Sequence, residues 1–230
     1  MCGAYGFSVK DSREVYGRFD IINTLAYFKP RWNIRTGSMN PVIFMTAAGV
    51  QIKEMYWSFL PSWAQEKRLP FSTFNARDDR LLESKVYKSA VPGQRCIIPA
   101  TYFFEPDKVH YPKPPHPWYC FRLKDQEIFG LAGLYNIWTD PKTMGELYTY
   151  TIITTKPNAV VGKYHDREAA LLRKNEEKQW LNPDITEPER VLPLLKSYPP
   201  ETMESWRVAD AAKNPKNDYP EVIKPLSPIP

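Results

Sequence analysis

The sequence predicts a single β-rich α+β domain. Its 230 residues are 43% hydrophobic and 14% aromatic, which is enough apolar material to fill a sizeable core. Twenty-three prolines against ten glycines favour short strands and stiff loops over long helices. Because no linker, repeat or low-complexity block divides the chain, we expect residues 1–230 to form one domain, with the segment 211–230 packed on or beside it.

The first predicted elements are a short helix and a β-hairpin. Residues 11–19 predict a helix because Asp11 or Ser12 can accept a hydrogen bond from the free amide groups at its start. Residues 41–60 predict a hairpin, since β-prone runs stand on either side of the small residues 47–49.

The central and C-terminal parts are predicted to alternate strands with short helices. Helical spacing of apolar residues predicts a helix over 76–90. The apolar run "RCIIPATYFFE" predicts one buried strand over 95–105 that ends in a carboxylate. Further strands are predicted at 117–123, 128–138, 147–155 and 169–172, and further short helices at 158–165, 175–181 and 188–198.

Composition narrows the classes of function. A net charge of +5 permits a nucleic-acid partner without requiring one. Three cysteines are too few and too odd in number for a disulfide framework, and with three scattered histidines they give no zinc-ligand spacing. We expect no metal and no cofactor. No secretory segment follows Met1, and no run of about 18 apolar residues could span a bilayer. We therefore expect a reduced, cytoplasmic monomer without a membrane partner.

The chain begins "MCGAYGF", so removal of Met1 would leave Cys2 with a free amine and a thiol. Such a residue can attack a carbonyl through sulfur, with its own amine as the general base. Alternatively, the amine can condense with an aldehyde, and the sulfur can close a thiazolidine ring. An α-amine has a pKa of about 7.7–8.0 against about 10.4 for lysine, so more of it is unprotonated at neutral pH. A packed thiol without chemistry is the alternative that position alone leaves open.

Four further polar residues are candidates for a site. Glu105 ends a buried strand, where burial raises a carboxyl pKa and suits it to proton transfer, although a salt-bridged strand end would look the same. His165 stands in the polar stretch "GKYHDRE", where a structural role is the alternative. Asn75 and Arg77 are two residues apart, so in an extended segment they face the same way, and arginine suits phosphate.

Nine short stretches carry a family resemblance. They run in family order along nearly the whole chain: "MCG" (1–3), "PRWNI" (30–34), "WSFLPSWA" (57–64), "FNAR" (74–77), "RCIIPATYFFE" (95–105), "AGLY" (132–135), "IITTKPN", "HDRE" (165–168) and "NPKNDYPEVIKPL". In these stretches the chain resembles the SOS response-associated peptidase (SRAP) family. The resemblance implies twisted antiparallel sheets in a barrel-like core, with short helices outside.

The resemblance also implies a function. SRAP proteins bind single-stranded DNA, or a junction of single- and double-stranded DNA, that carries an abasic site. Their N-terminal cysteine forms a thiazolidine crosslink with the ring-opened sugar. The implied activities are cysteine-dependent peptidase-type or autoproteolytic processing of the N-terminus and a DNA-lyase-like activity. Such a protein would be associated with the nucleoid while it is bound to DNA.

Four residues match the catalytic positions of the family. Cys2 matches the crosslinking nucleophile, which must lie in a cleft that a sugar aldehyde can enter. Asn75 matches the amide that holds the cysteine and the sugar. Glu105 matches the proton-shuttling carboxylate, and His165 matches the histidine that aids ring opening and crosslink reversal.

Other positions match DNA contacts of the family. Arg77 matches a phosphate-binding arginine, and Trp63 an aromatic residue beside the strand. Asn33 and Thr154 match the polar lining of the groove.

Two additional basic residues are candidates for DNA contacts. Lys85 lies on the helix predicted after "FNAR", where a solvated helix face is the alternative. Arg35 stands where family members carry a small residue; it either adds a phosphate contact or pairs with an acidic neighbour.

Two other readings fit parts of the sequence. "MCG" also opens the glutamine amidotransferases with an N-terminal nucleophile, but that site needs an Asn-Gly pair, and the chain has no such dipeptide. A glutaminase assay separates the two enzyme classes. A non-covalent single-stranded DNA-binding module would share the groove and would not need Cys2; it would leave no denaturation-resistant band with abasic DNA.

Overall fold

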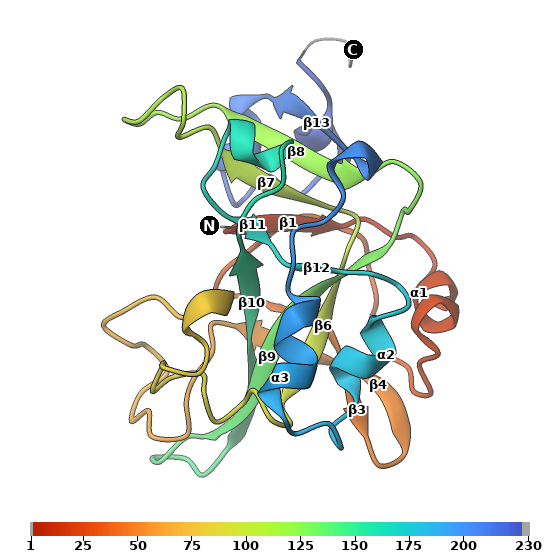
Figure 1. Cartoon of the computed structure of the whole chain (residues 1–230), viewed down its shortest axis with the longest axis vertical. Coiled ribbons are helices and arrows are strands. Elements are labelled where there is room, and N and C mark those ends of the chain that lie inside the picture. Colours follow the sequence, from red (N-terminus) through yellow and green to blue (C-terminus); the bar gives the residue numbers. More distant parts are fainter. Residues whose placement is uncertain (1, 227–230) are drawn as a thin grey trace.

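Two β-sheets form the framework of the protein (Figure 1). The computed structural model describes residues 2–226. The strands are β1 Ala4–Phe7, β2 Arg31–Arg35, β3 Met39–Thr46, β4 Gly49–Trp57, β5 Asn75–Arg77, β6 Arg95–Ala100, β7 Tyr102–Pro106, β8 Trp118–Leu123, β9 Phe129–Thr139, β10 Glu146–Thr155, β11 Glu168–Ala169, β12 Leu171–Leu172 and β13 Met203–Val208.

Five strands of the larger sheet close into a barrel in the order β10–β4–β3–β6–β9, because β9 pairs again with β10. Most pairings are antiparallel, while β10 runs parallel to β4 and to β5. The short strands β11 and β12 fill the gap where β9 and β10 diverge, and Ala170 bonds to Ala132 on one side and Ile153 on the other. The predicted β-rich, barrel-like fold is confirmed.

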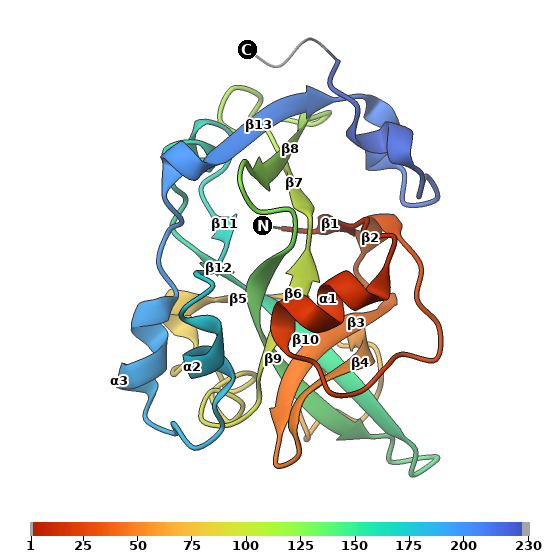
Figure 2. The same ribbon diagram turned by 90° about the vertical axis from the view of Figure 1, so that its right-hand side faces the viewer.

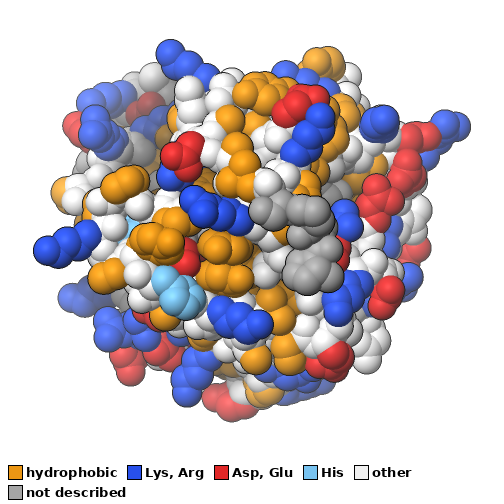
Figure 3. All heavy atoms as spheres, turned by 90° about the horizontal axis from the view of Figure 1, so that it is seen from above, with side chains coloured by type: hydrophobic (Ala, Val, Ile, Leu, Met, Phe, Trp, Pro, Cys, Tyr) orange, Lys and Arg blue, Asp and Glu red, His pale blue; other side chains and the backbone are white. Residues whose placement is uncertain are grey.

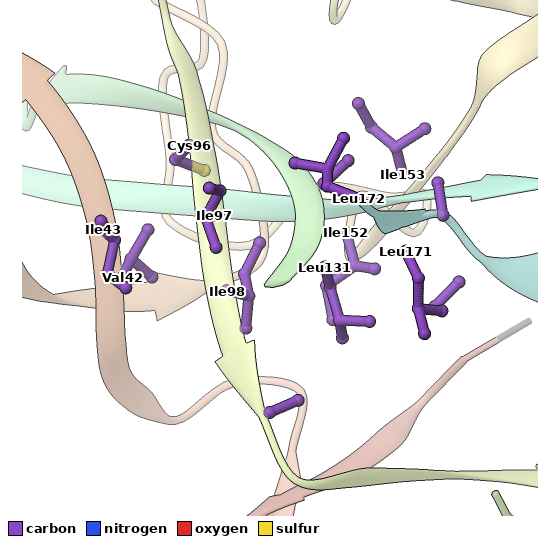
Figure 4. Close-up of a cluster of buried hydrophobic side chains, with 14 of the residues drawn as sticks. Val42, Ile43, Cys96, Ile97, Ile98, Leu131, Ile152, Ile153, Leu171 and Leu172 are labelled. Carbon is purple, nitrogen blue, oxygen red and sulfur yellow. The ribbon is translucent and has the colours of Figure 1, made fainter. Parts of the chain in front are cut away.

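Buried side chains from β3, β6, β9, β10 and β12, nearly all of them aliphatic, belong to one hydrophobic core cluster around the barrel strands (Figure 4). These residues come from five strands far apart in sequence, and nearly all are shielded from water. Burial of this apolar surface is the main force that holds the barrel closed.

The second sheet lies against the upper end of the barrel, in the antiparallel order β13–β8–β7–β1–β2 (Figure 2). The run 95–105, predicted as one strand, is two: β6 in the barrel and β7 in the second sheet. The chain bends at Thr101, whose backbone N–H and hydroxyl both donate to the Gly6 carbonyl oxygen. The bend brings the end of β7, with Glu105, next to the start of β1.

Short helices cover the outside of the sheets. The helix α1 spans Ser12–Phe19, and the Asp11 side chain accepts a hydrogen bond from the Arg13 N–H, as the sequence predicts. The other α-helices are α2 Glu177–Leu181 and α3 Pro188–Val191.

The prediction of a helix over residues 76–90 is wrong. Only a three-residue turn, Asp78–Arg80, is helical, and a series of turns follows it. Asp78 is held by bonds from Thr155 and Arg167, and the Ser84 hydroxyl accepts the Val86 N–H. These local and long-range bonds compete with a continuous helix.

The C-terminal residues pack on the second sheet. After β13, the segment 210–226 crosses the outside of β2 and β8, and residue Val208 bridges to Pro225. Asp218 accepts hydrogen bonds from the Trp32 and Asn33 backbone amides and pairs with Arg31. The last part of the predicted segment, 227–230, lies outside the described residues. Within residues 2–226, no helix is both long and apolar enough to cross a membrane.

Candidate functional site

Cys2 lies just before β1, where the two sheets meet, and it is fully buried. Its thiol donates to the Ala4 carbonyl oxygen at a Sγ–O distance of 3.6 Å. Burial raises the pKa of the Cys2 thiol far above its ordinary value; the Glu105 carboxylate raises it further, and the Arg35 guanidinium lowers it. The thiol is therefore protonated at neutral pH, and it does not lie in the open cleft that the sequence analysis expects.

Glu105 and His165 lie next to each other in this buried region. Glu105 comes from the end of β7 and His165 from the segment that leads into β11, with 3.8 Å between Oε2 and Nε2. Burial raises the pKa of Glu105 to about 7. Burial lowers the pKa of His165 to about 4. At neutral pH the imidazole is therefore uncharged, while the carboxyl group can both donate and accept a proton.

The loop after β7 holds the histidine segment in place. The Lys108 and Val109 backbone amides both donate to the Tyr164 carbonyl oxygen, and the Tyr164 ring stacks on Tyr119 with centroids 3.9 Å apart. The Lys108 charge lowers the pKa of both Glu105 and His165. The sequence analysis missed Lys108, because one lysine in a loop has no signal that separates it from a solvated charge.

Asn75 and Arg77 lie on β5 and line the same cavity of about 450 Å³. The Asn75 Nδ2 donates to the Ile152 carbonyl oxygen at 3.3 Å. Its Oδ1 is buried, and no donor among the described residues reaches it. The exposed Arg77 guanidinium forms an ion pair with Asp79. The structure thus brings this predicted pair to the wall of one cavity, with the Arg77 guanidinium exposed and the Asn75 Oδ1 buried.

Trp63 and Lys85 are neighbours on the surface. Trp63 is 49% exposed, and its Nε1 donates to the Lys85 carbonyl oxygen at 3.4 Å. Lys85 is exposed and lies on a turn, not on the predicted helix. Both side chains are thus exposed to solvent, and the Trp63 indole is bonded to the backbone of Lys85.

The predicted groove-lining role of Asn33 and Thr154 needs correction, because both side chains are buried. The Asn33 amide donates to the carbonyl oxygens of Ala212, Asn214 and Asn217, so it holds the C-terminal segment on β2. Thr154 is fully buried within the barrel sheet, and its hydroxyl donates to the Ala76 carbonyl oxygen. Neither side chain lines an open surface.

Arg35 is half-buried at the edge of the second sheet. Its guanidinium donates to Asn33 Oδ1 and to the Ala212 carbonyl oxygen, and it lies 4.5 Å from the centre of the Trp118 ring. Within residues 2–226, no carboxylate pairs with it, so the acidic-neighbour alternative does not hold. Burial lowers its pKa to about 10, and the group remains charged at neutral pH. This positive charge acts on the Cys2 thiol.

Residues 1–215 match the family model described as SOS response associated peptidase (SRAP). The chain belongs to the SRAP family. This SRAP chain is 34% identical over 227 residues to the abasic site processing protein YoqW of Bacillus subtilis (strain 168), with 97% of this chain and 99% of YoqW covered. It is 30% identical over 226 residues to YoaM of the same organism, also named an abasic site processing protein, with 97% of each chain covered.

Solved structures share the SRAP fold seen in this chain. A protein from Bacteroides thetaiotaomicron superposes with a TM-score of 0.83 at 25% identity, and the match covers 98% of this chain and 100% of that one. A protein from Bordetella bronchiseptica gives a TM-score of 0.77 at 20% identity, with 90% of this chain and 100% of that one covered. These likenesses confirm the fold class predicted from the sequence.

Proposed function

We propose that this SRAP protein processes abasic sites by forming a covalent crosslink between Cys2 and the ring-opened sugar of single-stranded DNA. The names of its relatives YoqW and YoaM support the substrate class. The observation that carries the proposal is the setting of Cys2, whose thiol lies within the electrostatic influence of Glu105 and Arg35. Family membership favours this reaction over the glutamine amidotransferase alternative.

The proposed reaction needs no oxidant or cofactor. Hydrolysis of the bond after Met1 frees the Cys2 amine, which adds to the sugar aldehyde; loss of one water then gives an imine. The sulfur adds to the imine carbon, and the thiol proton passes to nitrogen, which closes the thiazolidine ring. Glu105, with a pKa of about 7, can donate a proton to the departing hydroxyl group and accept one when the crosslink reverses.

His165 has a different part in this proposal. Because its pKa is about 4, it is neutral at physiological pH and does not serve as a cationic acid. Its Nδ1 lies 3.1 Å from the Arg167 backbone nitrogen, from the Arg167 carbonyl oxygen and from Asp166 Oδ1, and its Nε2 lies 3.8 Å from Glu105 Oε2. In the proposed mechanism, this imidazole orients the Glu105 carboxyl group and supports ring opening.

Crosslinking in this proposal requires the removal of Met1. While the chain begins at Met1, the Cys2 nitrogen is an amide and cannot form an imine. Met1 itself lies outside the described residues. We propose that an aminopeptidase removes it, since cysteine is a small second residue, and that the form retaining Met1 does not crosslink.

DNA recognition in this proposal does not depend on base pairing at the lesion, because an abasic nucleotide has no base to read. Phosphate contacts and stacking of neighbouring bases must supply the affinity. Arg77 and Lys85 are exposed cations, the backbone of Lys85 is bonded to the half-exposed Trp63, and Arg35 supplies a charge that acts on Cys2. The ring of Trp63 offers a face for a neighbouring base.

Denaturing electrophoresis after incubation with a uracil-excised oligonucleotide tests the proposal. The wild-type protein should give a band that survives detergent and heat. Cys2→Ala should lose this band and keep its affinity for single-stranded DNA, while Cys120→Ala, which removes a thiol from the second sheet's core, should keep both. A crosslink of normal yield in Cys2→Ala would show that another nucleophile reacts.

A further inference from the structure

Glu168 is a buried carboxyl group that the proposed reaction does not use. It lies on β11, shortly after His165 in the chain, and it is fully shielded from water. Its Oε2 accepts a hydrogen bond from the Asn158 backbone N–H at 2.9 Å, and its Oε1 accepts one from the Tyr198 backbone N–H at 3.1 Å. A buried carboxyl group is costly unless it is hydrogen-bonded, and here its two oxygens join three segments of the chain.

Asn158 connects the Glu168 carboxylate to the segment that carries His165. The Asn158 Oδ1 accepts hydrogen bonds from two backbone N–H groups, one of them that of Val161 at 3.0 Å, and so begins the helical turn Val161–Lys163. The Val161 carbonyl oxygen in turn accepts the His165 backbone N–H at 3.0 Å. A continuous series of bonds therefore runs from the Glu168 carboxylate to the backbone of His165.

The backbone of Tyr198 fixes this series to a further segment of the chain. Glu168 accepts its N–H, and the Asn158 Nδ2 donates to its carbonyl oxygen at 3.0 Å. Glu168 also pairs with Thr155 in the short ladder between β10 and β11. The loop between those strands is thus closed by the Glu168 side chain as well as by backbone pairing, and His165 lies within this loop.

We propose that Glu168 is a positioning residue for the crosslinking reaction, because its carboxylate closes the loop that holds His165 next to Glu105. His165 and Glu105 come from different segments, with 3.8 Å between Nε2 and Oε2, so their approach depends on where the loop lies. Glu168 takes no part in the chemistry itself and acts only through His165. The inference rests on the proposed function for the reaction that His165 supports.

The kinetics of Glu168→Gln test this role. Glutamine keeps the size of the side chain and replaces one accepting oxygen by an NH₂ group, so one backbone N–H loses its acceptor. At saturating abasic DNA, the rate of crosslink formation should fall by about 10- to 100-fold, the effect of a small misplacement of a catalytic group. Affinity for an oligonucleotide with a tetrahydrofuran abasic analogue, which cannot crosslink, should keep the wild-type value.

Glu177→Gln is the matched control, since Glu177 is also a buried glutamate with a raised pKa, but it lies on α2 and pairs with Arg18. This variant should crosslink at the wild-type rate. Both variants are compared at pH 8, above the Glu168 pKa of about 7, which burial raises.

A double-mutant cycle with His165→Ala separates positioning from a general loss of stability. If Glu168 acts through His165, Glu168→Gln slows the wild-type protein and has no further effect on His165→Ala. Equal slowing in both backgrounds, or no slowing of the wild-type protein, would overturn the inference.

NMR titration of the histidine rings gives a second readout that needs no DNA. Burial lowers the pKa of His165 to about 4. Opening of the loop admits water, so Glu168→Gln should move this pKa toward the ordinary value of about 6.5, while Glu177→Gln should not. The His165→Ala spectrum identifies the signal among the three histidines. An unchanged His165 titration in Glu168→Gln would contradict the positioning role.

Asn158→Ala tests the same series of bonds from its other end, and it gives the answer if Glu168→Gln does not fold. It keeps the Glu168 carboxyl group and removes the side chain that begins the turn, so the His165 pKa should shift in the same direction. Failure of the proposed function is distinguishable, because it would appear as a wild-type protein without a Cys2-dependent band, whatever the histidine titration shows.

Discussion

Burial shifts the pKa values of the neighbouring groups Glu105 and His165 in opposite directions. It disfavours the charged form of each, so the carboxyl pKa of Glu105 rises to about 7 and the imidazole pKa of His165 falls to about 4. The result is a pair that carries at most one charge near neutral pH. Glu105 therefore has a pKa matched to proton transfer under physiological conditions.

Substitution Glu105→Gln should stabilise the protein at alkaline pH. The folded-state pKa of Glu105 is raised from 4.5 to about 7, so folding becomes less favourable as the pH rises through that window. Glutamine does not titrate, and the variant should gain up to about 3 kcal/mol above pH 7 and nothing below about pH 4.5. Urea unfolding at pH 5 and pH 8 measures this difference.

The exposed Glu127 provides the control, because Glu127→Gln should give the same small change at both pH values. A Glu105→Gln effect that is equal at pH 5 and pH 8 would contradict the buried, raised-pKa carboxyl group. The same variant should also slow crosslink formation or reversal without loss of DNA binding.

At the scale of elements, the contact between β2 and the C-terminal segment stabilises one side of the second sheet. Asn33 donates to three backbone carbonyl oxygens there, and its Oδ1 in turn accepts a hydrogen bond from Arg35. This contact fixes the position of the Arg35 guanidinium, and it explains why Asn33 is not part of an open groove.

Asn33→Ala should destabilise this contact. It leaves buried carbonyl groups without donors, which costs about 1–3 kcal/mol. Hydrogen exchange should become faster in residues 211–218 and remain unchanged in the barrel strands β3 and β6. Uniformly faster exchange throughout the protein, or none, would show that the side chain does not hold this segment.

Short sequence patterns correctly predicted those elements that are stabilised by contacts between residues close in sequence. The hairpin 41–60 forms as β3 and β4, since the turn residue Gly49 takes a φ of 127° that glycine readily adopts. The break of 95–105 at Thr101 was not predictable, because it depends on a bond to Gly6, some ninety residues away in sequence. β1 itself was missed, as four residues with a central glycine give a weak strand signal.

In the candidate site, too, local features were predictable and the effects of long-range contacts were not. Chemistry and family motifs were enough to choose Cys2, Glu105 and His165 as candidate site residues. Burial was predicted only for Glu105. The buried positions of Asn33 and Thr154 depend on segments that contact them from far along the chain, which single-sequence patterns do not report. The turns after β5 replaced a predicted helix for the same reason.

At the scale of the whole molecule, the net charge is only +5. On the face over β8 and β13, Lys and Arg side chains are spread among hydrophobic and acidic ones (Figure 3). We therefore expect DNA binding to rely on a few placed cations.

Salt dependence tests this view through Arg35. Affinity for single-stranded DNA should fall with rising salt, and Arg35→Gln should reduce the slope of log K against log salt by about 0.7. Arg13→Gln is the matched control, since Arg13 is an exposed arginine already paired with Asp11. An unchanged slope in Arg35→Gln would remove Arg35 from the phosphate contacts.

Peptide mapping by mass spectrometry of the protein–DNA adduct tests the central claim most directly. The protein is purified from cells, reacted with abasic single-stranded DNA and digested with a protease and a nuclease. We predict that the sugar remnant is attached to an N-terminal peptide that begins at Cys2, with the mass of a ring formed by loss of one water. A retained Met1 on the adduct, or a remnant on a lysine such as Lys108, would contradict the account.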